Sequence, residues 1–122
     1  MKKLSLYVFL ILMVCNVGFA KCVEGNCIDG KGTYKWTSGK RAGDKYLGQF
    51  KDSKMHGQGT YTYLNGDRYI GYFKNGREHG DGFFKSTEKG NSYVGQFEDG
   101  FIHGRGVFEL ANGKKYIGRF EY

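Results

Sequence analysis

Residues 69–84 read YIGYFKNGREHGDGFF, and similar stretches begin at residue 46 (YLGQFKDSKMHGQGTY) and at residue 93 (YVGQFEDGFIHGRGVF). Recurrence at a nearly constant spacing makes this internal repeat the feature that decides the fold. Each copy carries one histidine directly before a glycine. A histidine that recurs in this way is a candidate metal ligand, a candidate acid–base group or a part of the scaffold.

Two short motifs define the repeat. Tyr-x-Gly-x-Phe occurs four times, at steps of 23, 24 and 23 residues, and Gly-x-Gly occurs four times in alternation with it. His-Gly precedes or overlaps Gly-x-Gly in three copies, whereas Asp29-Gly30 takes its place in the first. The structural repeat positions are Tyr46, Gly48, Phe50, His56, Gly57, Tyr69, Gly71, Phe73, His79, Gly80, Tyr93, Gly95, Phe97, His103, Gly104, Tyr116, Gly118 and Phe120.

The pattern inside each copy has a period of two, which is typical of β-strands. Tyr69, Gly71 and Phe73 fall on one face of a strand, while Ile70 and Tyr72 fall on the other. A glycine between two aromatic residues leaves a gap that a neighbouring ring can fill. Stacked hairpins can therefore bury a continuous aromatic ridge that one hairpin alone cannot form.

The turns are expected at two kinds of glycine-containing dipeptide. Asn65-Gly66 and Asn112-Gly113 separate alternating runs and favour type I′ hairpin turns, in which both central residues have positive φ. His79-Gly80 is expected to turn the chain into the next hairpin. The sequence thus predicts an all-β chain of about four hairpins with eight strands, arranged as an elongated, single-layer, twisted antiparallel sheet.

The repeat resembles the MORN repeat family. The matching residues follow the pattern G-x-G-x-Y/F, G-x-x-Y-x-G-x-F and x-x-G-x-x-H-G, and they extend over residues 30–122. The departures are Ser53 in place of a linker glycine, Asp29 in place of the first histidine, and about four extra residues around Ser38–Gly43. The resemblance implies tandem hairpins that serve in scaffolding, dimerisation or protein interaction, and phospholipid binding has also been proposed for the family.

The N-terminal segment has the organisation of a signal peptide. Lys2 and Lys3 precede an apolar run, and Gly18-Phe19-Ala20 places small residues before a cut after Ala20. We therefore divide the chain into a signal peptide (1–20), a disulfide-bearing N-terminal cap (21–29) and a MORN-repeat domain (30–122). This organisation predicts export to the periplasm or the extracellular space, and export argues against a nucleic acid partner.

Cysteine usage agrees with an oxidising compartment. Cleavage removes Cys15 and leaves Cys22 and Cys27, which we expect to form a disulfide. A zinc half-site would need two further ligands, and none is close in the sequence.

Catalytic and metal-binding chemistry are not favoured. Equivalent positions in successive hairpins lie roughly 10 Å apart, so His56, His79 and His103 are too far apart to share one ion. We expect each imidazole to bond backbone groups in a glycine-rich turn. Gly-x-Gly lacks the following Lys-Ser/Thr and the helix of a phosphate loop. The sequence predicts a non-enzyme with no cofactor.

Charge suggests one binding surface. The chain has 19 Lys and Arg against 12 Asp and Glu, and the excess falls near the predicted hairpin tips. Such an edge is either a solvated surface or a site for anionic lipid or polysaccharide. The candidate contacts are Lys40, Arg41, Lys45, Lys85, Lys89, Lys114 and Lys115. The candidate aromatic surface anchors are Tyr61, Tyr63, Tyr72, Phe83, Phe84 and Phe101.

The last strand, expected at residues 115–122, has no following strand to cover its edge. An exposed edge is either protected by charge or paired with another chain. The sequence therefore predicts a non-catalytic interaction or structural module that contacts another protein, or itself, through this edge. The alternative is a peripheral envelope or membrane binder that uses the basic tips.

Overall fold

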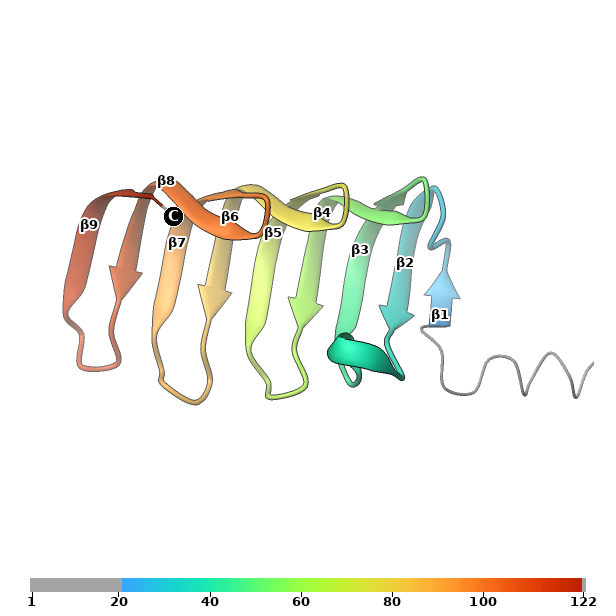
Figure 1. Ribbon diagram of the computed structural model, residues 1–122, viewed down its shortest axis with the longest axis horizontal. Coiled ribbons are helices and arrows are strands. Elements are labelled where there is room, and N and C mark those ends of the chain that lie inside the picture. Colours follow the sequence, from blue (N-terminus) through green and yellow to red (C-terminus); the bar gives the residue numbers. More distant parts are fainter. Residues whose placement is uncertain (1–20, 122) are drawn as a thin grey trace, which may run out of the picture.

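The computed structural model describes residues 21–121, and the predicted signal peptide lies outside them. Nine strands form one antiparallel sheet in which each strand pairs with its neighbours in the chain (Figure 1). The elements are β1 (Lys21–Gly25), β2 (Gly30–Lys35), the 3₁₀ turn η1 (Gly39–Arg41), β3 (Lys45–Lys51), β4 (Lys54–Thr62), β5 (Arg68–Lys74), β6 (Arg77–Lys85), β7 (Ser92–Glu98), β8 (Phe101–Glu109) and β9 (Lys115–Phe120). The predicted all-β, single-layer architecture is confirmed, with β1 as a ninth strand.

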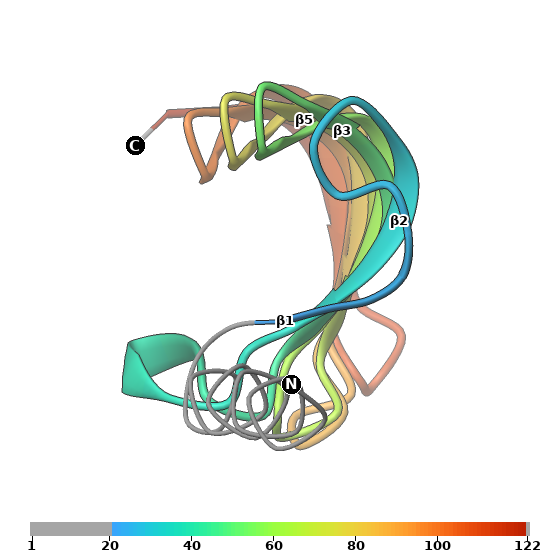
Figure 2. The ribbon, with the colours of Figure 1, turned by 90° about the vertical axis from the view of Figure 1, so that its right-hand side faces the viewer.

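Two rows of residues cross the whole repeat sheet in register. One row consists of glycines, and the row beside it consists of aromatic residues. The glycine row is Gly32, Gly48, Gly59, Gly71, Gly82, Gly95, Gly106 and Gly118; the aromatic row is Tyr34, Tyr46, Tyr61, Tyr69, Phe84, Tyr93, Phe108 and Tyr116. Seen end-on, the strands curve into a C (Figure 2). Absence of side chains along the glycine row allows the sheet to bend there around the rings.

The core lies on the inside of this curve. Tyr46, Tyr69 and Phe73 are essentially inaccessible to solvent although the sheet has only one layer. Burial alternates along β3 and β5, which confirms the predicted assignment of faces. Tyr46, Tyr69 and Tyr93 each reach past the glycine two residues later, and the Tyr46 hydroxyl donates to the Gln49 carbonyl at 2.7 Å. The rings of Tyr46 and Tyr69 both pack edge-on against Phe73, with centroids 5.0 Å apart.

The chain turns at positions other than His-Gly. Asp52-Ser53, Asn75-Gly76 and Asp99-Gly100 have positive φ at both residues, which is the geometry of a type I′ turn. The prediction that His79-Gly80 turns the chain is therefore wrong. His79 and Gly80 lie inside β6, next to a bulge.

The His-Gly positions belong to irregular pairing within the sheet. In β4, three residues (56–58) stand opposite the single residue Gln49, and Gly57 takes a φ of +84° there. The Gln49 side-chain oxygen accepts the Gln58 N–H at 2.8 Å, and Gln96 does the same for Arg105. A bulge of this kind bends the strand, so the outer part of each long hairpin folds over the core.

The predicted type I′ geometry is also wrong at Asn65-Gly66 and at Asn112-Gly113. Gly66 has a φ of +92°, but Asn65 is not among the residues with positive φ. The Gly66 N–H donates to the Tyr63 carbonyl at 2.9 Å, and Tyr63 N–H donates to the Asp67 carbonyl at 2.9 Å. Residues 63–66 thus form a four-residue turn whose last residue is a left-handed glycine, a common longer hairpin connection.

Candidate interaction surfaces

The three histidines contact side chains of neighbouring segments. His103 Nε2 lies 3.2 Å from a Glu98 carboxylate oxygen, and His79 Nδ1 lies 3.9 Å from Asp99. The His56 ring packs against Tyr72, with centroids 6.1 Å apart. The structure gives none of these imidazoles a backbone hydrogen bond within residues 21–121, and the buried His79 Nδ1 has no hydrogen-bond partner. The prediction of imidazole-to-backbone bonds is therefore wrong, although the histidines remain parts of the scaffold.

Neither a metal cluster nor a bilayer-spanning helix occurs in the described part of the chain. No group of three or more His, Cys, Asp or Glu side chains within residues 21–121 is arranged to hold a metal ion. Over the same residues, no helix combines the length and the hydrophobicity needed to cross a membrane.

Asp44 anchors the first tip loop to the sheet. The Tyr61 hydroxyl donates to Asp44 Oδ2 at 2.6 Å, and the Leu64 N–H donates to Asp44 Oδ1 at 2.9 Å. Burial, together with the hydrogen bond to this carboxylate, raises the pKa of Tyr61. The Arg41 guanidinium lies over Trp36, 5.3 Å from the ring centroid. Because both oxygens of buried Asp44 are occupied by structural bonds, this group holds the loop in place.

The inside of the curve carries shallow clefts next to this network. One, of about 530 Å³, is lined by Lys40, Arg41, Asp44, Met55, Tyr61, Tyr63, Leu64, Asn65 and Glu78. Its polar groups bond one another, since the Tyr63 hydroxyl donates to Glu78 at 3.2 Å. A second cleft, of about 330 Å³, is mainly aromatic and is bordered by Phe84 and Phe101.

The predicted aromatic anchors divide between core and surface. Tyr61 is only 3% exposed and belongs to the core, so its assignment as a surface anchor is wrong. Tyr63 and Phe84 are partly buried and pack against that core. Phe101 is 45% exposed and keeps the character of a surface residue.

The predicted basic residues gather along one edge of the ribbon. The connections at 36–44, 63–67, 86–91 and 110–114 lie on the same side of the sheet, at the bottom of Figure 1, and we call this side the tip edge. Lys40, Arg41, Lys89 and Lys114 lie in these connections, while Lys45, Lys85 and Lys115 lie at the adjoining strand ends.

On the outside of the curve, several of these basic residues form a cross-strand row together with Lys35, an arrangement that the sequence did not predict. Lys35 pairs with Lys45, and Arg68 pairs with Lys85, so like charges stand directly opposite across neighbouring strands. All four side chains are exposed. The residue before the repeat tyrosine is basic at Lys45, Arg68 and Lys115, a signal that could have revealed the row. Beside it runs an apolar row of Leu47, Ile70, Phe83, Val94, Val107 and Ile117.

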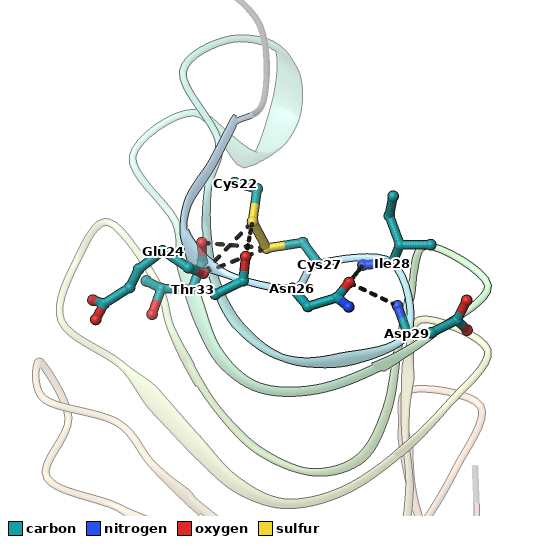
Figure 3. Close-up of a disulfide and its surroundings, with 8 residues drawn as sticks. Cys22, Glu24, Asn26, Cys27, Ile28, Asp29 and Thr33 are labelled. Atoms are coloured by element: carbon teal, nitrogen blue, oxygen red, sulfur yellow. Dashed lines mark hydrogen bonds between the residues drawn. A yellow bond between two sulfur atoms is a disulfide. The ribbon is translucent and has the colours of Figure 1, made fainter.

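The two ends of the sheet differ. At the N-terminal end, β1 covers β2, and Cys22 and Cys27 form a disulfide with Cα atoms 5.9 Å apart (Figure 3). The turn that follows is held by Asn26, whose side-chain oxygen accepts the N–H groups of Ile28 and Asp29 at 3.0 Å each. At the C-terminal end of the described chain, β8 is the one strand that pairs with β9. Tyr116 and Ile117 of β9 are 47% and 78% exposed.

Comparison with known proteins agrees with the repeat seen in the structure. The family model described as MORN repeat matches four segments, at residues 28–41, 46–68, 69–88 and 93–115. No curated protein matches the chain. MORN repeats are generally non-catalytic modules that mediate contacts with proteins or lipids. With matches over most of its length, the chain belongs to the MORN repeat family.

Proposed function

We propose that this chain is a non-catalytic interaction module that binds a partner protein, or a second copy of itself, by adding a strand to the edge of β9. The observation that carries the proposal is the state of Tyr116. Its counterparts Tyr46, Tyr69 and Tyr93 are buried, whereas Tyr116 is 47% exposed. Among the described residues, Tyr116 is therefore the repeat tyrosine without the strand that covers each of the others.

The missing contact can be defined from the inner repeats. A Cβ added to Gly59 would overlap the Tyr46 ring, so that ring occupies the space above a glycine of the next strand. At the C-terminal end, Gly118 has no atom within 4 Å of an added Cβ, and within residues 21–121 no strand follows β9 in the sheet. A partner strand that places a glycine opposite Gly118 would complete the pattern, and its backbone would pair with the free edge of β9.

A peptide from the chain itself is a suitable probe. Residues 54–62, KMHGQGTYT, form β4, the strand that covers Tyr46. We expect this peptide to bind the isotope-labelled chain of residues 21–122 and to shift the amide resonances of residues 115–120. A matched peptide with Gly59→Val fills the space needed by the tyrosine ring, and we expect it to bind about tenfold more weakly or worse.

Two variants locate the site. Ile117→Lys places a charge on the edge strand and is expected to abolish binding. Ile70→Lys makes the same change in the same exposed row, but on an interior strand, and should leave binding unchanged. Strand addition at β9 is refuted if the KMHGQGTYT peptide does not bind, or if Ile70→Lys and Ile117→Lys weaken binding equally.

We further propose that the chain is exported and cleaved after Ala20. The predicted signal peptide supports this, and so does the disulfide between Cys22 and Cys27. Intact mass measurement of the protein from its native source is expected to give an N-terminus at Lys21 with the disulfide oxidised. A chain that retains residues 1–20 contradicts cleavage.

A second candidate function is binding to an anionic surface through the basic row and the tip edge. The supporting observation is the opposition of Lys35 with Lys45 and of Arg68 with Lys85, because like charges in direct cross-strand positions destabilise a sheet unless anions neutralise them. Sedimentation with vesicles of anionic phospholipid is expected to carry the chain down at low salt. Replacing the vesicles by neutral ones, raising the salt concentration, or introducing Lys114→Glu/Lys115→Glu should each abolish this co-sedimentation. Vesicle binding that none of the three changes affects would contradict the anionic-surface proposal.

A further inference from the structure

The first repeat strand, β2, is the counterpart of β4. Gly30–Tyr34 reads GKGTY and Gly57–Tyr61 reads GQGTY. Gly32 pairs with Gly48 as Gly59 pairs with Gly71. The equivalence extends upstream, since the carbonyl of Ile28 accepts the Ser53 N–H and that of Met55 accepts the Gly76 N–H, both at 2.9 Å. Strand β2, together with the two residues before it, is thus a segment of the kind that covers a repeat tyrosine.

The space above the glycine of β2 is filled by the disulfide. Above Gly59, Gly82 and Gly106 this space holds the ring of the tyrosine on the preceding strand. Above Gly32, where no repeat precedes, the nearest atom to an added Cβ is Cys27 Sγ, at 2.8 Å. Cys27 is only 8% exposed and belongs to the aromatic core. The sulfur of Cys27 therefore occupies the position that a tyrosine ring takes in the later repeats.

The two ends of the sheet are consequently complementary. The C-terminal end has a tyrosine strand without a glycine strand, and the N-terminal end has a glycine strand whose tyrosine position is blocked. We propose that β1 and the Cys22–Cys27 disulfide form a removable cap, and that the partner of β9 is β2 of a second copy from which this cap has been displaced. This inference rests on the proposed strand addition at β9 and names its occupant.

The register of such a contact follows from the inner repeats. By analogy with the pairing of β3 and β4, Tyr116 would stand opposite Tyr34, and Gly118 opposite Gly32 of the second copy. Pairing of β9 with another β9 is disfavoured, because with Gly118 opposite Gly118 two Tyr116 rings would compete for one space. Head-to-tail pairing gives each ring its own glycine strand.

The disulfide determines whether the cap stays in place. All five residues of β1 are exposed, so the backbone ladder to β2 and the disulfide hold this strand. A dithiol reductant would give up two electrons and two protons, break the Cys22–Cys27 bond into two thiols, and itself become a disulfide. The reduced cap is then held by the ladder alone, and β9 of another copy can replace it.

The cap proposal is tested by measuring the molar mass of the chain of residues 21–122 with size-exclusion chromatography coupled to light scattering. We expect the oxidised chain to be monomeric and the chain reduced with dithiothreitol to form oligomers that grow with concentration. Cys22→Ser/Cys27→Ser should oligomerise without reductant, which excludes cross-linking through thiols. Tyr116→Ala should weaken association of the reduced chain about tenfold or more. Added salt should strengthen it, because Lys115 would face Lys35 of the second copy.

The outcomes separate the cap from the strand addition it relies on. If the KMHGQGTYT peptide binds the oxidised chain while the reduced chain stays monomeric, the cap proposal is overturned and strand addition at β9 stands. If the peptide does not bind, both are overturned. Oligomers that persist unchanged in Tyr116→Ala also overturn the cap proposal. Circular dichroism shows whether the Cys22→Ser/Cys27→Ser variant is folded. If the variant is unfolded, the oligomeric state of the reduced native chain alone tests the cap proposal.

Discussion

Gly82 offers the most direct test of how the sheet is packed. The structure gives it no positive φ, so alanine fits the backbone, and any cost must come from the space above it. An added Cβ would come within 2.5 Å of Tyr69 Cε2 and 2.6 Å of Tyr69 Cζ. Ordinary contacts of a Cβ begin near 3.4 Å, so the Tyr69 ring would have to move by roughly 1 Å.

The cost of this movement has two parts. Overpacking a well-filled core costs about 1–3 kcal/mol. Movement of the ring also breaks the hydrogen bond from the Tyr69 hydroxyl to the Tyr72 carbonyl, which is 2.9 Å long and contributes about 1 kcal/mol. We therefore expect Gly82→Ala to lower the free energy of unfolding by about 2–4 kcal/mol, which corresponds to a Tm lower by roughly 10–20 °C for a domain of this size.

A double-mutant cycle isolates the cause. With Tyr69→Ala the ring is absent, so Gly82→Ala in that background should be neutral, or stabilising by about 0.5 kcal/mol through reduced backbone entropy of the unfolded chain. Urea denaturation followed by circular dichroism measures all four proteins. The reasoning is refuted if Gly82→Ala changes stability by less than about 0.5 kcal/mol in the native background, or by the same amount in both backgrounds.

Three further predictions concern stability. Burial raises the pKa of Tyr46, Tyr61, Tyr69 and Tyr93, so these hydroxyls lose their protons at a lower pH in the unfolded chain than in the folded one. The free energy of unfolding should therefore be constant below about pH 10 and fall as the pH rises above it. A urea midpoint that does not change up to about pH 11.5 would contradict this prediction. Ser53 has a φ of +63°, so Ser53→Gly should raise the free energy of unfolding, measured by thermal denaturation, by about 0.5–1 kcal/mol. The control Ser38→Gly changes a residue with extended backbone and should lower the free energy of unfolding. Equal effects of the two variants would show that the left-handed turn carries no strain. Reduction of the Cys22–Cys27 disulfide in monomeric Tyr116→Ala should lower the free energy of unfolding by about 2 kcal/mol, and an unchanged urea midpoint would show that the cap does not restrict the unfolded chain.

The sheet could be predicted because its causes are local. Alternation along Tyr69, Gly71 and Phe73 sets the inner face, and repetition of the motif sets the order of the strands. The turn types could not be assigned in the same way, because Asn65-Gly66 and Asn75-Gly76 are the same dipeptide in different connections. Only the second has positive φ at both residues, and the length of the loop that the paired strands leave determines which form occurs.

Features that depend on pairing between distant residues were not predictable. The strand β1 has five exposed residues and no aromatic alternation, so its pairing with β2 left no pattern in the sequence. The juxtaposition of Arg68 with Lys85 depends on the register across β5 and β6. The filling of the space above Gly32 by Cys27 depends on a turn shaped by Asn26.

The account rests most heavily on backbone pairing at the free edge of β9, and amide hydrogen exchange measures this directly. The oxidised chain of residues 21–122 is compared with and without the KMHGQGTYT peptide. Because N–H groups of an antiparallel edge strand point alternately inward and outward, the account predicts that alternate amides among residues 115–120 exchange rapidly in the free chain and become protected in the complex. Exchange rates for these amides that are the same with and without bound peptide would contradict strand addition at β9.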